Sequence, residues 1–253
     1  MMLLNYTREG RGLPLVLVHG YLGGAAIWRA QIDFFSPRFD VIAPDLSGFG
    51  ESADLEAPDT IDAFARQVLG LLDDLGIQRF HLLGHSMGGM IVQHLAAIAP
   101  ERIERLVCYG TGPLGVLPNR FETIEQSRAR LERDGLKATA RRIAATWFIN
   151  GERAEGYPVC AALGEKATMQ AALASLSAWE TWDGRSAVPT ITADTLIIWG
   201  DRDRSYGWSQ PEALWKGIAN SSLAVVPGCA HAAHLEKPHL FNSIVEDFLS
   251  ANE

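Results

Sequence analysis

Cysteine is scarce in this sequence. The three cysteines, Cys108, Cys160 and Cys229, are an odd number at wide spacing, and they form no C-x-x-C pair. This pattern argues against both a disulfide framework and a cysteine-based zinc site. Because unpaired thiols suit a reducing compartment, the sequence predicts a cytoplasmic protein.

Positively charged residues are also few. The chain has 22 Lys and Arg against 30 Asp and Glu, which gives a formal net charge of -8. Nucleic acids and anionic membranes would repel such a chain, so neither is expected as its main partner. Solubility is the simpler explanation of the charge. The sequence does not indicate which oligomeric state the protein adopts.

Long hydrophobic runs are missing as well. The N-terminus turns polar after Leu4, so we expect neither a signal-peptide core nor a membrane-spanning segment there. No cluster of Cys, His or carboxylates has the spacing of metal ligands, so no metal or other cofactor is expected. The 47% hydrophobic content of 253 residues is nevertheless ample for one large α/β domain.

The most informative stretch surrounds Ser86. The apolar run 80–83 predicts a short buried strand, and the spacing over 87–99 predicts a helix, so Ser86 lies on the turn between them. A turn this sharp leaves no room for a Cβ at the flanking positions, which are Gly84 and Gly88. This G-x-S-x-G pattern is typical of a nucleophile elbow. The structural alternative is a glycine-rich helix start with a serine N-cap.

Two backbone N–H groups are candidates for an oxyanion hole. Met87 carries the first free N–H of the helix that follows the elbow. A second glycine-rich loop begins at His19, after a buried strand at 15–18, and makes Tyr21 the candidate for the other donor. We interpret His19 as a brace of this loop rather than as a proton-transfer group.

Strands and helices alternate through the first part of the chain. A strand at 41–44 leads into the polar, glycine-containing loop 45–52, and apolar residues at helical spacing predict an amphipathic helix over 60–75. Every glycine-rich loop follows the carboxyl end of a strand. In doubly wound sheets, ligands bind at that edge.

The alternation breaks after a strand at 106–109. The residues from 112 to 189 contain no convincing strand, and a helical block between two strands of a sheet is a lid or cap. We therefore expect an α/β core of residues 1–111 and 190–253 with a helical cap at 112–189. Helical patterns in the cap cover 121–133, 136–149 and 167–179.

The cap is rich in aromatic side chains that could line a pocket over the sheet. They are Trp147, Phe148, Tyr157, Trp179 and Trp182. Trp147 and Trp179 are the candidates for substrate contact, although gluing the cap to the core is the simpler role for any single ring. A cap of this size predicts a pocket of ~300 Å³.

Two acids and two histidines supply what Ser86 lacks. Asp201 and Asp203 follow a predicted strand at 195–199, and His231 and His234 follow the next strand. A serine hydroxyl becomes a good nucleophile when a histidine takes its proton, and the imidazole needs a carboxylate partner. The order Ser, Asp, His along the chain fits an elbow serine.

Together these motifs resemble those of the α/β-hydrolases, and within them the small, helically capped serine hydrolases: carboxylesterases, enol-lactonases and meta-cleavage-product C–C hydrolases. The resemblance implies a mostly parallel, twisted α/β sheet flanked by helices, with an inserted helical cap. Only one strand's worth of chain precedes Leu15, so seven strands are expected. Epoxide hydrolases and haloalkane dehalogenases place Asp at the elbow, and Ser86 argues against both.

The resemblance also chooses between the acids and between the histidines. The family acid stands three residues after the glycine that ends its strand, which selects Asp203 and leaves Asp201 as the fallback. The family histidine lies five residues before a Glu that is closely followed by Pro, and Glu236 gives His231 that place. His234 is then a neighbour at the pocket wall and a candidate substrate contact.

Two residues depart from the family pattern. Ala230 replaces the glycine that usually precedes the family histidine, a small change that should leave the geometry intact. Ala232 stands where the C–C hydrolases usually carry Trp, which disfavours that activity.

These observations predict a cofactor-free serine hydrolase whose partner is a small-molecule ester, lactone or thioester. Cleavage of a C–C bond by the same triad is the alternative, and it would need a cation to anchor a substrate carboxylate. The candidate cations are Arg120, Arg153, Arg202 and Arg204. A ligand receptor or non-catalytic binding protein on the same fold is the alternative of another class.

Overall fold

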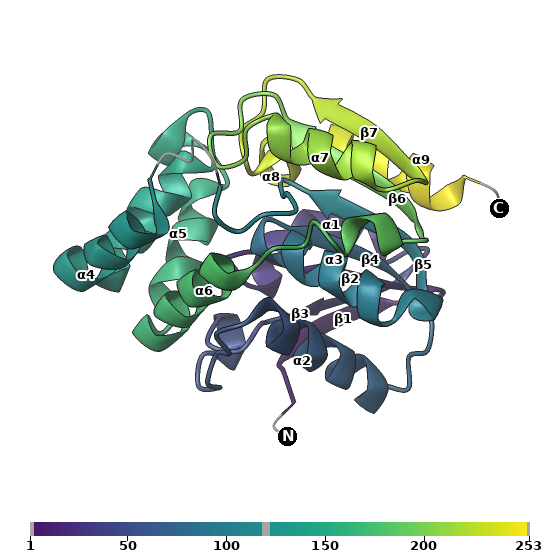
Figure 1. Cartoon of the computed structure of the whole chain (residues 1–253), viewed down its shortest axis with the longest axis horizontal. Coiled ribbons are helices and arrows are strands. Elements are labelled where there is room, and N and C mark those ends of the chain that lie inside the picture. The colour runs from purple at the N-terminus through teal and green to yellow at the C-terminus, as the bar shows by residue number, and fades with distance from the viewer. Residues whose placement is uncertain (1–2, 118–121, 252–253) are drawn as a thin grey trace.

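The computed structural model describes residues 3–117 and 122–251, and a seven-stranded sheet forms the centre of this part of the chain (Figure 1). Its strand order is β1-β3-β2-β4-β5-β6-β7, and all neighbours are parallel except β1 and β3. The predicted seven-stranded, mostly parallel sheet is thus confirmed. The strands are β1 (Tyr6–Gly10), β2 (Pro14–Val18), β3 (Asp40–Pro44), β4 (Phe80–His85), β5 (Ile103–Tyr109), β6 (Asp194–Gly200) and β7 (Ser221–Val226).

The central strands are apolar because both of their faces are covered. Every residue of β3 and β4 is buried, as are four of the five residues of β2, which is typical of parallel strands between helical layers. β1 is different. It lies at the sheet edge, and it alternates exposed with half-buried residues. An ion pair of 2.7 Å between Arg8 and Asp40 fastens it to β3.

Helices cover both faces of the sheet (Figure 1). α2 and α3 pack against each other, and so do α1 and α9. Thr60 caps α2 by accepting from Ala63 N–H at 3.2 Å, and an apolar stripe with Phe64 and Val68 faces the core, so the predicted amphipathic helix is confirmed. These helices are α1 (Arg29–Phe35), α2 (Ile61–Asp74), α3 (Met87–Ile98), α7 (Ser209–Gly217), α8 (Ala233–Glu236) and α9 (Pro238–Ser250).

Three α-helices of the described ranges lie between β5 and β6 in the sequence and stand to one side of the sheet, beyond the carboxyl ends of the strands (Figure 1). They are α4 (Ile124–Thr146), α5 (Tyr157–Lys166) and α6 (Met169–Thr181). Gly135, at φ 79°, kinks α4 between the two predicted helical patterns. The sequence did not predict α5. Phe121, the first residue of the pattern predicted at 121–133, lies outside the described residues.

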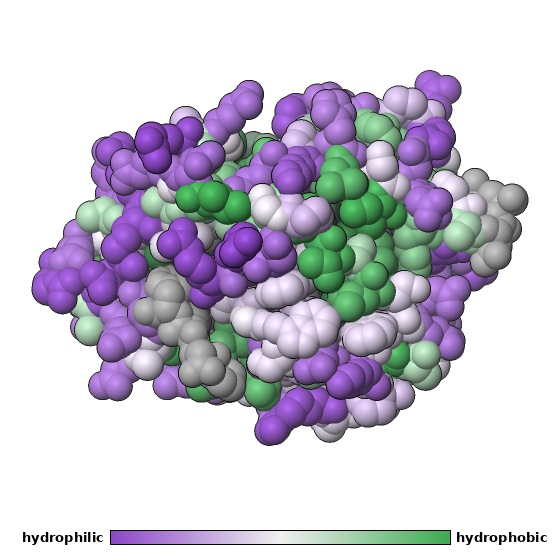
Figure 2. All heavy atoms as spheres, turned by 90° about the horizontal axis from the view of Figure 1, so that it is seen from above, coloured by the Kyte–Doolittle hydropathy of each residue, from purple (hydrophilic) through white to green (hydrophobic). Residues whose placement is uncertain are grey.

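The edge formed by α7 and β7 presents hydrophobic side chains in a patch between hydrophilic ones (Figure 2). Trp215 and Val225, on these two elements, are 40% and 43% exposed. Within the described ranges, no helix combines the length and the apolar character that crossing a membrane requires.

Candidate active site

Ser86 occupies a strained turn between β4 and α3. Its φ of 57° and ψ of -119° lie outside the regions that side-chain-bearing residues favour. A Cβ on Gly84 would lie 2.3 Å from the carbonyl oxygen of Gly88, and a Cβ on Gly88 would lie 2.3 Å from that of Val18. Both flanking glycines are therefore required by close backbone approach, which is the geometry of a nucleophile elbow.

Hydrogen bonds hold this turn against the end of β5. Ser86 N–H donates to the carbonyl of Tyr109 at 3.0 Å, and Thr111 Oγ1 donates to the carbonyl of Ser86 at 2.8 Å. The backbone of Ser86 is thus fixed through both its donor and its acceptor. This anchoring keeps the strained conformation in place.

The two predicted oxyanion donors lie next to Ser86. Met87 is the first residue of α3, so its N–H has no partner within the helix. Gly20 lets the other loop come close, because a Cβ there would lie 2.8 Å from Ser86 Cβ. Tyr21 follows directly, and its side chain lines the same pocket as Ser86.

His19 braces the loop that carries Tyr21, as the sequence predicted. Its Nδ1 donates to the carbonyl of Gly20 at 2.8 Å, and its Nε2 accepts from Leu46 N–H at 3.0 Å. Burial lowers the pKa of His19, although the charge of Asp45 opposes the shift. With both ring nitrogens occupied, His19 ties the two loops together.

Asp203 and His231 form a buried pair. Nδ1 of His231 lies 2.8 Å from Oδ2 of Asp203, while Oδ1 accepts from the backbone N–H groups of Ser205 and Tyr206 at 2.7 and 3.2 Å. A carboxylate oxygen only accepts, so Nδ1 carries the proton and Nε2 presents its lone pair. The alternative acid, Asp201, instead accepts from Gly228 N–H at 2.7 Å.

The ring and backbone of His231 are held by side chains that sequence reasoning missed. The ring stacks on Tyr206 at 5.6 Å and lies 4.5 Å from the ring of His85. The carbonyl of His231 accepts from the hydroxyl of Tyr109 at 2.7 Å and from Nε2 of His85 at 3.0 Å. The one sequence signal for His85 was its place beside Ser86 in the elbow pattern. Tyr109 carried no signal beyond its place at the end of a strand.

The imidazoles around His231 are neutral. Burial lowers the pKa of His85 well below its usual value, and the pKa is lowered further because a proton on His85 would be repelled by any proton bound to His231 or His234. Burial also lowers the pKa of His234 to about 3. These groups can therefore orient His231 while they stay uncharged near neutral pH.

Ser86 and His231 line one small pocket beneath the helices α4 and α6. The lining residues are Tyr21, Ser86, Leu117, Ile143, Trp147, Trp179, Ser205, Tyr206 and His231. The cavity holds about 20 Å³, which is room for about one water molecule. The predicted volume of ~300 Å³ was wrong, because aromatic side chains occupy the space between α4, α6 and Ser86.

Only two of the three residues predicted to contact the substrate line this pocket. Trp147 and Trp179 line this pocket, but His234 does not. His234 is buried on α8, where Nδ1 lies 3.1 Å from the hydroxyl of Tyr109 and the ring lies 4.7 Å from that of Trp28. The placement of His234 at the pocket wall was wrong, because the one-turn helix α8 directs its side chain into the core.

The candidate cations do not line the pocket either, as far as the described residues go. Arg204 donates to the carbonyl of Phe148 at 3.4 Å, and Arg202 and Arg204 line a separate outer hollow with Ile149. Arg153 lies in a short 3-10 helix after α4. Arg120 falls outside the described residues.

Metal binding finds no support in the described ranges, where no three His, Cys, Asp or Glu side chains gather into a possible metal site. The thiols are also poor nucleophiles. Burial raises the pKa of Cys160 to about 12 and that of Cys229 to about 11. Ser86, on its strained turn in the pocket, is therefore a better nucleophile candidate than these thiols.

Comparisons with known proteins agree with this geometry. Residues 14–238 match the family model described as alpha/beta hydrolase fold. The chain is 30% identical to the 2-hydroxy-6-oxo-6-phenylhexa-2,4-dienoate hydrolase of Comamonas testosteroni, over 98% of this chain and 91% of that protein. It is 29% identical to 3-oxoadipate enol-lactonase 2 of Acinetobacter baylyi, over 96% and 91%. The enol-lactonase of Burkholderia xenovorans LB400 superposes with a TM-score of 0.89 at 25% identity, over 98% of this chain and 96% of that one.

Proposed function

Because the chain belongs to the α/β-hydrolase family, we propose that it is a serine hydrolase that cleaves a small carboxylic ester, lactone or thioester through an acyl-enzyme on Ser86. The observation that carries this proposal is the 2.8 Å contact between His231 Nδ1 and Asp203 Oδ2 in a pocket that His231 shares with Ser86. A buried acid that orients a histidine toward an elbow serine is the arrangement that acyl transfer needs.

In the first half of the reaction, Nε2 of His231 takes the proton of Ser86 as Oγ attacks the substrate carbonyl. The N–H groups of Met87 and Tyr21 donate to the oxyanion that forms, and Asp203 stabilises the imidazolium. His231 then gives its proton to the leaving oxygen or sulfur, which departs and leaves the acyl group on Ser86.

Water completes the cycle by the same steps in reverse. His231 takes a proton from the water as it attacks the acyl-enzyme, and the proton passes to Ser86 when the carboxylic acid leaves. No step calls for a metal or an organic cofactor. The largely apolar lining of Ile143, Trp147 and Trp179 suits a small acyl group rather than a charged one.

C–C bond hydrolysis is the second candidate, since a relative that is 30% identical is named as a dienoate hydrolase. That reaction uses the same triad but must also hold a substrate carboxylate. No described residue that lines the pocket bears a positive charge. Ala232 also stands in the place where such enzymes usually carry Trp. We therefore favour the ester reaction.

The test is turnover of p-nitrophenyl butyrate by the wild type and by Ser86→Ala. Ser175→Ala is the matched control, because Ser175 is a fully buried serine of α6 whose hydroxyl has no hydrogen-bond partner among the described residues. Turnover that persists in Ser175→Ala and disappears in Ser86→Ala supports the proposal. A folded wild-type protein that binds esters without cleaving them would instead indicate a binding protein.

A further inference from the structure

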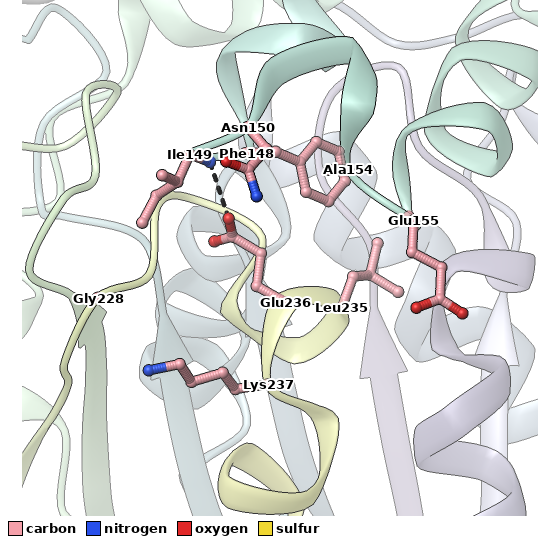
Figure 3. A pocket seen from close by; sticks show the side chains of 10 residues that line it. Phe148, Ile149, Asn150, Ala154, Glu155, Gly228, Leu235, Glu236 and Lys237 are labelled. Carbon is pink, nitrogen blue, oxygen red and sulfur yellow. Dashed lines mark hydrogen bonds between the residues drawn. The ribbon is translucent and has the colours of Figure 1, made fainter.

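Glu236 connects the loop that carries His231 to the cap helices. It lies at the end of α8, and its side chain points toward the segment after α4 (Figure 3). One oxygen, Oε2, accepts from the backbone N–H of Ala230 at 2.6 Å. The other, Oε1, accepts from the backbone N–H of Ile149 at 2.8 Å, the bond drawn as a dashed line in Figure 3. A single carboxylate thus joins the residue before His231 to residue 149.

The bridge depends on the chemistry of a carboxylate. Two backbone N–H groups, from segments far apart in the sequence, converge on one side chain that has two acceptor oxygens and no donor. A glutamine would keep one acceptor and turn an NH₂ group toward the other N–H. An aspartate is one methylene shorter and cannot span both. Only glutamate satisfies both groups, and hydrogen bonds to an ionised acceptor are stronger than neutral ones.

A second bond ties the other side of His231 to the same segment. Ala232 N–H donates to the carbonyl of Trp147 at 2.9 Å. Trp147 also lines the pocket, and its ring lies 6.1 Å from that of His231. The residues before and after His231 are therefore both fastened to residues 147–149, at the end of α4.

The pocket beside Ser86 is closed in this structure. A cavity of about 20 Å³ is too small for an acyl group, so side chains of α4 and α6 must move to admit a substrate. Ile149 follows the end of α4, so a displacement there would reach Ala230 through the two hydrogen bonds of Glu236. The return of α4 over a bound substrate would restore the position of His231 by the same route.

We propose, building on the serine-hydrolase function above, that Glu236 is a positioning residue that couples closure of the cap to alignment of His231. Glu236 does not line the pocket and touches no reacting atom. It acts through the backbone on both sides of the contact. Alignment matters steeply, because a displacement of about 1 Å can cost about 10²-fold in rate.

The variants Glu236→Gln and Glu236→Asp test the coupling. Glu236 and Glu155 both line the outer pocket drawn in Figure 3. Glu155→Gln is the matched control, because Glu155 is exposed and its substitution removes the same charge. Four quantities are measured in each folded variant. They are kcat and KM for p-nitrophenyl butyrate, the rate at which a small organophosphonate modifies Ser86, and the low-field proton resonance of His231 Nδ1–H.

We expect Glu236→Gln and Glu236→Asp to lower both kcat and the rate of phosphonylation by about 10-fold to 100-fold. The low-field resonance should shift or broaden, because the imidazole is no longer held in one position. Glu155→Gln should stay within about twofold of the wild type, since a surface substitution away from such contacts has small effects.

Several outcomes would overturn the coupling. Wild-type rates and a wild-type resonance in both Glu236 variants would show a bond that stabilises the fold alone, whatever the change in Tm. Full rescue by Asp but not by Gln would show that charge matters and the two-sided bridge does not. If Gln fails to fold, Asp decides the matter on the same measurements.

Failure of the coupling can be told from failure of the proposed function. If the wild type cleaves no ester but Glu236→Gln still alters the resonance and slows phosphonylation, the ester activity is wrong and the coupling stands. If esters are cleaved and the Glu236 variants match the wild type, the ester activity stands and the coupling is wrong.

Discussion

The hydroxyl of Tyr109, at the end of β5, donates to the backbone carbonyl of His231 at 2.7 Å. The same hydroxyl accepts from the backbone N–H of His234 at 3.2 Å and lies 3.1 Å from Nδ1 of that residue. The end of a central strand thus fixes the position of the loop that carries His231. Because β5 also accepts from Ser86 N–H, one strand positions both the nucleophile and its base.

Tyr109→Phe should slow the reaction and weaken the fold. Losing the hydroxyl leaves the carbonyl of His231 with His85 alone and leaves two donors of His234 without a partner, at a cost of about 1–3 kcal/mol in the free energy of unfolding. We expect kcat for p-nitrophenyl butyrate to fall about 10-fold and Tm to fall by about 2–4 °C per kcal/mol. An unchanged kcat, measured well below Tm, would contradict a positioning role.

Asp203→Ala should reduce kcat by about 10⁴, because the imidazole loses the partner that fixes its tautomer. Asp201→Ala is the matched comparison. It removes an acceptor from Gly228 N–H in the turn after β7, so thermal unfolding should shift while kcat stays within about an order of magnitude. The reverse ranking of the two kcat values would show that the acid has been assigned to the wrong residue.

Ile143→Ala should widen the acyl preference. Ile143 is buried on α4 and lines the pocket with Ser86, so its truncation opens space beside the nucleophile at a cost of about 2–5 kcal/mol in stability. The ratio of kcat/KM for p-nitrophenyl hexanoate to that for the butyrate should rise several-fold. Ile124→Ala, also on α4 but outside this pocket, should leave the ratio unchanged. Equal ratios in both variants would place acyl selection elsewhere.

Stability should fall in acid because of His81. Burial, aided by the charge of Arg105, lowers the pKa of His81 from 6.5 to about 4 in the folded protein. The unfolded chain therefore binds a proton below pH 6.5 that the folded chain does not bind until about pH 4. Stability is full above pH 6.5 and falls as the pH drops, by about 2 kcal/mol at pH 5 from this residue alone.

His81→Leu should remove that part of the acid sensitivity. It also removes two buried ring nitrogens that have no partner among the described residues. The free energy of unfolding in urea, measured at pH 8 and pH 5, should differ less in His81→Leu than in the wild type. His239→Leu, which removes an exposed imidazole of α9, is the control. An equal pH dependence in His81→Leu and the wild type would refute the assignment.

The parts of the fold that could be predicted are those in which local chemistry decides the structure. β2 to β6 are short apolar runs that parallel pairing buries on both faces, and α2 carries a regular apolar stripe. α5 was missed because its buried side is built from small residues such as Ala161 and Gly164, which give little periodic contrast. α7 was missed because its buried residues are few and include Gln210 and Pro211.

The features of the site that could be predicted are likewise those that local chemistry decides. The turn at Ser86 could be read from Gly84 and Gly88, because the steric demand is local. The clamp of Tyr109 on His231 and the bridge of Glu236 to Ile149 could not be predicted. The first contact joins two residues that are 122 positions apart in the sequence, and the second joins two that are 87 positions apart. No local sequence pattern marks such contacts. The pocket volume was also beyond reach, since it depends on how the rings of Trp147 and Trp179 pack.

The central claim is that Ser86 opens an ester rather than a carbon–carbon bond. Its most direct test is kcat/KM for p-nitrophenyl butyrate beside that for a ring-fission dienoate, measured on the wild type with Ser86→Ala as the blank. We predict that the ester is the faster substrate and that both rates disappear in the blank. A dienoate that is faster by about two orders of magnitude, a difference of about 2.7 kcal/mol in transition-state stabilisation, would contradict the claim.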